Sequence, residues 1–81
     1  RGAIVEQIAR AIEDRADALK ELETLDNGKP VREAAIDITQ AADAFRYYAG
    51  WASKLEGETI PVRGRVLNYT VREPVGVVGG I

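Results

Sequence analysis

Apolar residues in the first third of the chain recur at helical spacing. Intervals of three and four separate six of them, which are Ile4, Ile8, Ile12, Ala16, Leu19 and Leu22. Such intervals keep side chains on one side of a helix with about 3.6 residues per turn. Asn27-Gly28 favours the left-handed conformation that ends a helix. The pattern therefore predicts an amphipathic helix near residues 3–26.

A second helix is predicted near residues 31–56. Pro30 suits its first turn, because the first N–H groups of a helix have no partner in any case. The apolar positions again alternate by three and four, and they are Ile38, Ala41, Phe45, Tyr48, Ala52 and Leu55. Gly50 weakens this helix and Gly57 ends it. Because the connection is short, we expect the two helices to pack as an antiparallel hairpin.

After Gly57 the apolar period changes to two. Strands are expected near residues 59–62, 66–73 and 75–80, with alternate side chains on opposite faces. The Val-rich run after Pro74 is typical of a strand buried on both faces in a parallel sheet. The predicted fold class is therefore α+β: a helical hairpin, then a β-arm, then one strand of a larger α/β sheet.

Charge and composition exclude several classes of function for this chain. The 81 residues include 11 Lys and Arg against 13 Asp and Glu, a net charge of −2, with no Cys and no His. This balance gives no general attraction to nucleic acid, and no apolar run reaches the roughly 20 residues needed to cross a membrane. Thiolate and imidazole chemistry is excluded within these residues. We expect a cytoplasmic chain without catalytic residues, with neither nucleic acid nor membrane as partner, and cut from a longer protein.

Three clusters could still bind a ligand. The glycine-rich run at residues 76–80 departs from the G-x-G-x-x-G pattern of a dinucleotide loop, so strand glycines are the preferred interpretation. Arginines on the predicted arm could contact nucleic acid, but a solvated turn is preferred in so acidic a chain. The aromatic residues from Phe45 to Trp51 could stack on a ligand, although at helical spacing they more often form a core or an interface.

Four stretches of sequence carry a resemblance to a known family. They are LETLDNGKP at residues 22–30, FRYYAGW at 45–51, GETIP at 57–61 and NYTVREPVGVV at 68–78. In this order they resemble the N-terminal part of the aldehyde dehydrogenase superfamily. The resemblance implies that residues 1–57 are a helical hairpin of the coenzyme-binding domain. It implies that residues 58–74 are an arm that reaches a neighbouring subunit, and that residues 75–81 begin the nucleotide-binding sheet.

The resemblance also implies an activity for the whole parent protein. In the family a cysteine thiolate attacks an aldehyde, hydride passes to NAD or NADP, and water activated by a glutamate releases the carboxylic acid. None of these groups lies in this chain, so the chain alone is expected to be inactive, with the aldehyde a substrate of the full-length parent only. The alternative is a non-catalytic interaction module. In both cases we expect a homo-oligomer formed through residues 59–81, with Tyr47, Tyr48 and Trp51 near the contact.

Two positions match functional positions of the family. Asp26 matches a residue that often binds a structural monovalent cation, and a carboxylate at the negative end of a helix suits a hard cation. The alternative is an acidic residue in an ordinary turn. Ile81 matches a residue that lies along the nicotinamide side of the coenzyme, and its alternative is an apolar residue at the end of a strand.

Overall fold

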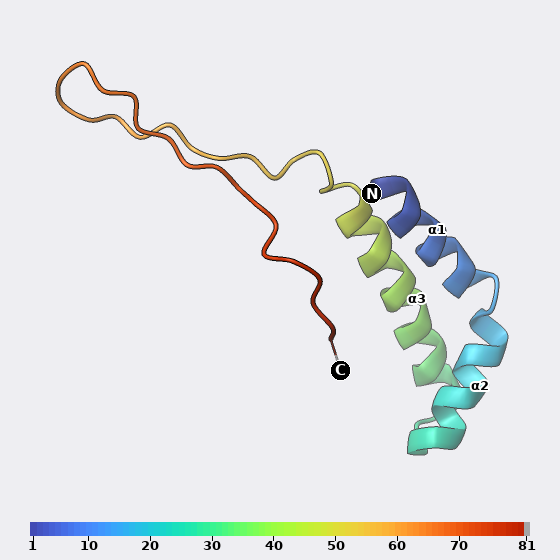
Figure 1. The fold of residues 1–81 in the computed structure, drawn as a ribbon. Helices are drawn as coiled ribbons and strands as arrows, with labels where there is room; N and C mark the ends of the chain where they lie inside the picture. Colours follow the sequence, from blue (N-terminus) through green and yellow to red (C-terminus); the bar gives the residue numbers. More distant parts are fainter. Residues whose placement is uncertain (81) are drawn as a thin grey trace.

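The computed structural model describes residues 1–80. It contains three helices, α1 (Gly2–Glu13), α2 (Ala16–Asn27) and α3 (Val31–Ala49). The helices α1 and α2 follow one another along the side of α3, and the chain then leaves the helices as a long extended arm, residues 57–80 (Figure 1). The molecule is accordingly elongated, with principal extents of 63 × 24 × 21 Å.

The single helix predicted near residues 3–26 is wrong, because the structure divides it into α1 and α2. Asp14 keeps helical angles, but Arg15 has φ −113° and ψ 13°, outside the helical region. Apolar residues spaced by four advance around a helix by about 40° at each step. One straight helix would therefore carry its later apolar residues away from α3, and the break redirects α2 onto the same partner.

The last helix is shorter than predicted. It ends at Ala49, and Gly50 caps it instead of lying inside it. Turns with tighter hydrogen bonds follow, such as Trp51 N–H to the Tyr48 carbonyl at 3.1 Å and Lys54 N–H to the Trp51 carbonyl at 2.9 Å. Glycine lowers helix stability by about 1 kcal/mol relative to alanine, and here it suffices to end the regular helix.

The predicted α+β class is also wrong. Residues 1–80 contain no strand, neither in the arm nor in the Val-rich run that was expected to begin an α/β sheet. Only an isolated antiparallel bridge forms, between Thr59 and Tyr69. A two-stranded ribbon is marginal unless a third strand or a helix covers it, and all of residues 51–80 are exposed. Apolar and polar residues do alternate in the arm, but a stable strand also needs a further strand or a helix against it. Within the described residues none lies there.

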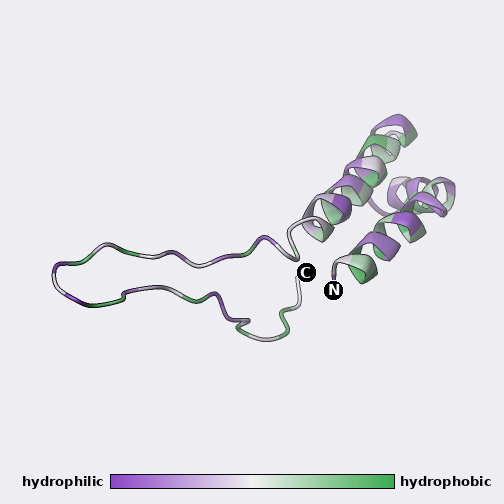
Figure 2. Ribbon diagram, turned by 90° about the horizontal axis from the view of Figure 1, so that it is seen from above, coloured by the Kyte–Doolittle hydropathy of each residue, from purple (hydrophilic) through white to green (hydrophobic). Residues whose placement is uncertain are grey.

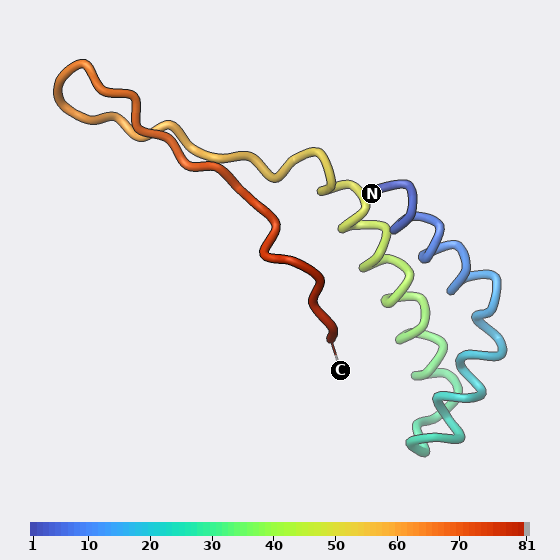
Figure 3. Tube along the Cα trace, viewed as in Figure 1, coloured from blue at the N-terminus to red at the C-terminus, as the bar shows by residue number. Residues whose placement is uncertain are grey.

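The arm nevertheless has a defined register. Ile60 N–H donates to the Asn68 carbonyl at 2.8 Å, and Thr70 N–H donates to the Glu58 carbonyl at 2.8 Å. These two bonds flank Thr59 and Tyr69, which face each other as a non-hydrogen-bonded pair. The two limbs run antiparallel and join in a loop around Gly64, whose φ of 95° favours glycine (Figure 3).

Gly57 is required where the limbs begin to pair, and its replacement gives a direct test. A Cβ atom at residue 57 would overlap the backbone carbonyl of Thr70, and displacing Thr70 would break the bond from its own N–H to the Glu58 carbonyl. We expect Gly57→Ala to abolish the bridge while leaving the helices intact. The Hα–Hα nuclear Overhauser effect between Thr59 and Tyr69 measures it. Gly79→Ala is the control, since a Cβ there meets nothing within 4 Å. A bridge that persists in Gly57→Ala contradicts the register.

The helices pack through small side chains. Among residues 1–80 the fully buried apolar residues are alanines: Ala9 in α1 and Ala34 and Ala42 in α3. Several larger residues expected in the helical seam are exposed instead, including Ile4 at 63% and Leu22 at 62%. In Figure 2 apolar (green) and polar (purple) residues alternate along the helices. Alanine contacts let the helices approach closely, but they bury little apolar area.

Ion pairs supplement this small core. At the α2–α3 corner, Lys29 pairs with Asp37 and lies 3.6 Å from Glu23. The hydrogen bond with Asp37 is the main reason that the pKa of Lys29 is raised above its ordinary value. Both pairs are partly exposed, so water and salt weaken them. Their main role is to fix where α2 ends relative to α3.

Within residues 1–80, no helix combines the length and apolar character that a membrane crossing requires.

Candidate functional site

An exposed aromatic face lies at the end of α3. We define this aromatic face as Tyr47, Tyr48, Trp51 and Leu55, which together with Ala52 line a pocket open to solvent. The rings of Tyr47 and Tyr48 meet edge to face at 5.1 Å between centroids, and Tyr47 lies 6.2 Å from Trp51. The rings therefore hold one another in place without being covered.

The exposure of this aromatic face corrects the predicted second seam. Tyr48 is 66% exposed and Leu55 is 69% exposed, although both lie in the apolar seam predicted for the second helix. The helix α3 turns Ala34, Ala42 and their neighbours toward α1 and α2 instead. Rings that combine apolar area with a hydroxyl or an indole N–H suit an interface better than a sealed core. The arrangement can bind another apolar surface.

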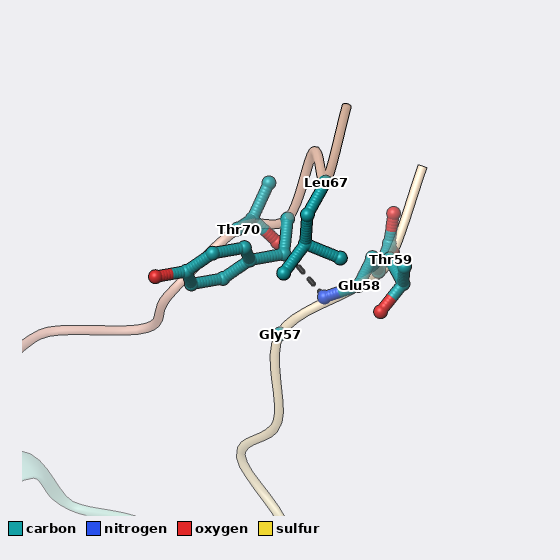
Figure 4. A pocket seen from close by; sticks show the side chains of 6 residues that line it. Gly57, Glu58, Thr59, Leu67 and Thr70 are labelled. Carbon is teal, nitrogen blue, oxygen red and sulfur yellow. Dashed lines mark hydrogen bonds between the residues drawn. The ribbon is translucent and has the colours of Figure 1, made fainter. Parts of the chain in front are cut away.

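A second pocket lies between the limbs of the arm. Gly57, Glu58, Thr59, Leu67, Tyr69 and Thr70 line it. In Figure 4 the dashed line marks the bond from Glu58 N–H to the Thr70 hydroxyl, 2.9 Å long. This bond joins the two limbs, so the polar atoms in the pocket stabilise the arm. The pocket is an open surface, and a structural role accounts for the polar contact between its two sides.

Arg46 is the residue that sequence reasoning missed. Its guanidinium donates to Glu13 at 2.8 Å and to Asp43 at 3.3 Å, and it lies 3.7 Å from Glu6. The hydrogen bond with Glu13 is the main reason that the pKa of Arg46 is raised. The spacing of Asp43 and Arg46 could have indicated one pair, but nothing local predicts a contact across 33 positions to Glu13. Arg46 ties α1 to α3 directly beside the aromatic face.

Comparison with known proteins decides the family. A sequence model described as "Aldehyde dehydrogenase family" matches residues 1–81, the whole chain. The chain belongs to the aldehyde dehydrogenase family. The resemblance seen in the four sequence stretches is thereby confirmed.

Several aldehyde dehydrogenases are similar over the full chain. The chain is 50% identical over 82 residues to a putative aldehyde dehydrogenase, DhaS, of Bacillus subtilis, covering 100% of this chain and 17% of that protein. It is 48% identical over 82 residues to a mitochondrial aldehyde dehydrogenase of Equus caballus, and 46% identical over 81 residues to an aldehyde dehydrogenase of Aspergillus niger, covering 16% of each protein. The chain thus spans about a sixth of these relatives. No solved structure was found to match it.

The two positions carried over from the aldehyde dehydrogenase family remain predictions. Asp26 lies exposed in the last turn of α2, and residues 1–80 contain no group of three Asp, Glu, His or Cys side chains that could hold a metal ion. Asp26 could therefore offer only one carboxylate, beside the carbonyl groups that a helix end leaves open. Ile81 lies outside the described residues.

Proposed function

We propose that this chain is the N-terminal helical and arm segment of an NAD(P)-dependent aldehyde dehydrogenase that oxidises an aldehyde to a carboxylic acid. Its own role is to provide a scaffold and subunit contacts. The observation that carries the proposal is the family match over all 81 residues. The exposed aromatic face and arm support it, because both are surfaces that a larger protein would cover.

The chain's residues do not fit a coenzyme site by themselves. Dinucleotide pyrophosphate is commonly bound at the N-terminus of a helix that follows a glycine turn. In the part of the chain that the structure describes, the glycines after Pro74 lie in extended, fully exposed chain and precede no helix. The expected boundaries of 1–57 for the helical part, 58–74 for the arm and 75–81 for the segment after Pro74 belong to this proposal.

Two finer parts of the proposal concern partners. The homo-oligomer would form through residues 59–81, where apolar side chains are open on both limbs. Asp26 would supply one oxygen ligand to a structural monovalent cation, with the other ligands contributed by the rest of the parent protein. A cytoplasmic location stays a prediction, and one similar protein is named as mitochondrial.

The catalytic part of the proposal predicts that the isolated chain turns over no aldehyde. Nucleophilic attack and stabilisation of the oxyanion supply most of the rate in acyl chemistry, and the 81 residues include no Cys to form a thioester. We expect no NAD(P)H fluorescence above the no-protein blank with aliphatic or aromatic aldehydes. A full-length family member at equal molarity is the positive control. NAD(P)H formation that copurifies with the 8.8 kDa chain through two columns contradicts the scaffold role.

A further inference from the structure

Asn27, the last residue of α2, is followed by Gly28, and this pair of residues is chemically reactive. Asn27-Gly28 is the single Asn-Gly step in the sequence. Asparagine followed by glycine cyclises most readily, because glycine offers no side chain to shield its backbone nitrogen. Asn27 is exposed, so water reaches it freely. Whether Asn27 cyclises in the folded chain therefore depends on the geometry of its backbone and its hydrogen bonds.

Hydrogen bonds hold the Gly28 nitrogen and both polar atoms of the Asn27 side chain. Gly28 N–H, the nucleophile, donates to the Thr24 carbonyl at 2.9 Å as the C-cap bond of α2. The Asn27 side-chain amide donates to Glu23 at 2.6 Å, and its carbonyl oxygen accepts from Lys29 N–H at 2.8 Å. Cyclisation needs the Gly28 nitrogen to turn onto the Asn27 side-chain carbon. The helical backbone and the cap bond point that nitrogen back along α2.

We propose that Asn27 is a deamidation site that the C-cap of α2 protects, and that it reacts when this cap opens. In the reaction the Gly28 nitrogen bonds to Asn27 Cγ, and the bond from Cγ to Nδ2 breaks. The proton from the Gly28 nitrogen leaves together with Nδ2 as ammonia. Water then opens the cyclic imide to aspartate or isoaspartate. Solvent water is the one other reactant, and no oxidant or reductant is needed.

The product also opposes closure of the cap. Aspartate at residue 27 replaces a donor to Glu23 with a second negative charge, and it adds that charge at the negative end of the helix dipole. Isoaspartate additionally inserts a methylene group into the backbone. One opening event is thereby converted into a lasting loosening of the α2–α3 corner.

Opening of the corner can be changed without touching the reacting residues. Lys29 pairs with Asp37 on α3, ten residues after Asn27, so Asp37→Asn weakens the corner while the local sequence stays the same. Asp43→Asn is the matched control, since it removes a contact with Arg46 at 3.3 Å elsewhere on α3. Asn68 is followed by Tyr69 and not by glycine, so its deamidation is slow even without structure. It serves as an internal reference.

The test is peptide mapping by mass spectrometry of the 81-residue chain after incubation at mildly alkaline pH, folded and in concentrated urea. We expect Asn27 to deamidate at least about tenfold more slowly when folded, equivalent to about 1.4 kcal/mol of opening free energy. Asp37→Asn should accelerate the folded rate several-fold and leave the urea rate unchanged, whereas Asp43→Asn should change neither.

A measurement on the unaltered chain makes the test independent of how the variants fold. Hydrogen exchange of the Gly28 amide reports the same opening, so its protection factor should match the ratio of the urea and folded rates. Equal rates in the folded and urea states overturn the proposal, as does a fast folded rate with a strongly protected Gly28 amide. Failure of aldehyde dehydrogenase function would leave these results untouched.

Discussion

The 81-residue chain should sediment as a dimer or larger oligomer at micromolar concentration. A compact protein of 8.8 kDa exposes about 4,800 Å², but this chain exposes 7278 Å². Its radius of gyration is 19.3 Å, against about 12 Å for a compact domain of this length. The excess of about 2,500 Å² per chain is larger than the roughly 600–1,000 Å² that each partner buries in a standard interface, so one such contact would cover part of it.

The arm is where association is expected. Val71 is 64% exposed and Val77 is fully exposed, on extended chain whose N–H and C=O groups can pair with another molecule. We expect Val71→Lys and Val77→Lys to shift the sedimentation profile toward monomer. Gln40→Lys adds the same charge to an exposed position of α3 and is the control. A folded monomer at every concentration, unaffected by the arm lysines, would show that residues 59–81 form no contact.

The helical part could be predicted in outline because its signals are local. Asn27-Gly28 does end a helix, with Gly28 in the left-handed conformation at φ 77°, and Val31 does begin the next one after Pro30. The prediction was wrong about which side of the first helix is buried. Rows of isoleucine indicated a seam through Ile4 and Ile8, yet Ala9 is the residue fully buried in α1. Size alone favours the isoleucines, whereas close packing of helices favours the alanine.

The prediction of strands in the arm was wrong for a different reason. Alternation at Leu67, Tyr69 and Val71 indicates which side chains share a face, and it carries no information on whether a neighbour covers that face. The structure leaves all three exposed. Strand formation is a property of the pair or sheet, so a pattern within one segment cannot decide it. Arg46 was missed for the same reason, because its strongest partner, Glu13, is distant in sequence.

The second large effect concerns the packing of α1 and α2 against α3. Ala42 is 1% exposed, and no residue larger than alanine is fully buried in the described chain. Adding three carbon atoms at such a position forces the helices apart and costs about 1–3 kcal/mol. A core this small supplies no more than about 3–5 kcal/mol in all. We therefore expect Ala42→Leu to remove most of the stability of the helical part.

Urea unfolding followed by circular dichroism measures the effect of Ala42→Leu. Ala44→Leu is the matched control, because Ala44 is exposed two positions further along the same helix and both changes have the same helix propensity. The control should stay within about 0.5 kcal/mol of the unaltered chain. If the two variants unfold at the same midpoint, the alanine contacts are not what joins the helices. The ion pairs of Arg46 and Lys29 would then have to account for the fold, which partly exposed pairs rarely do.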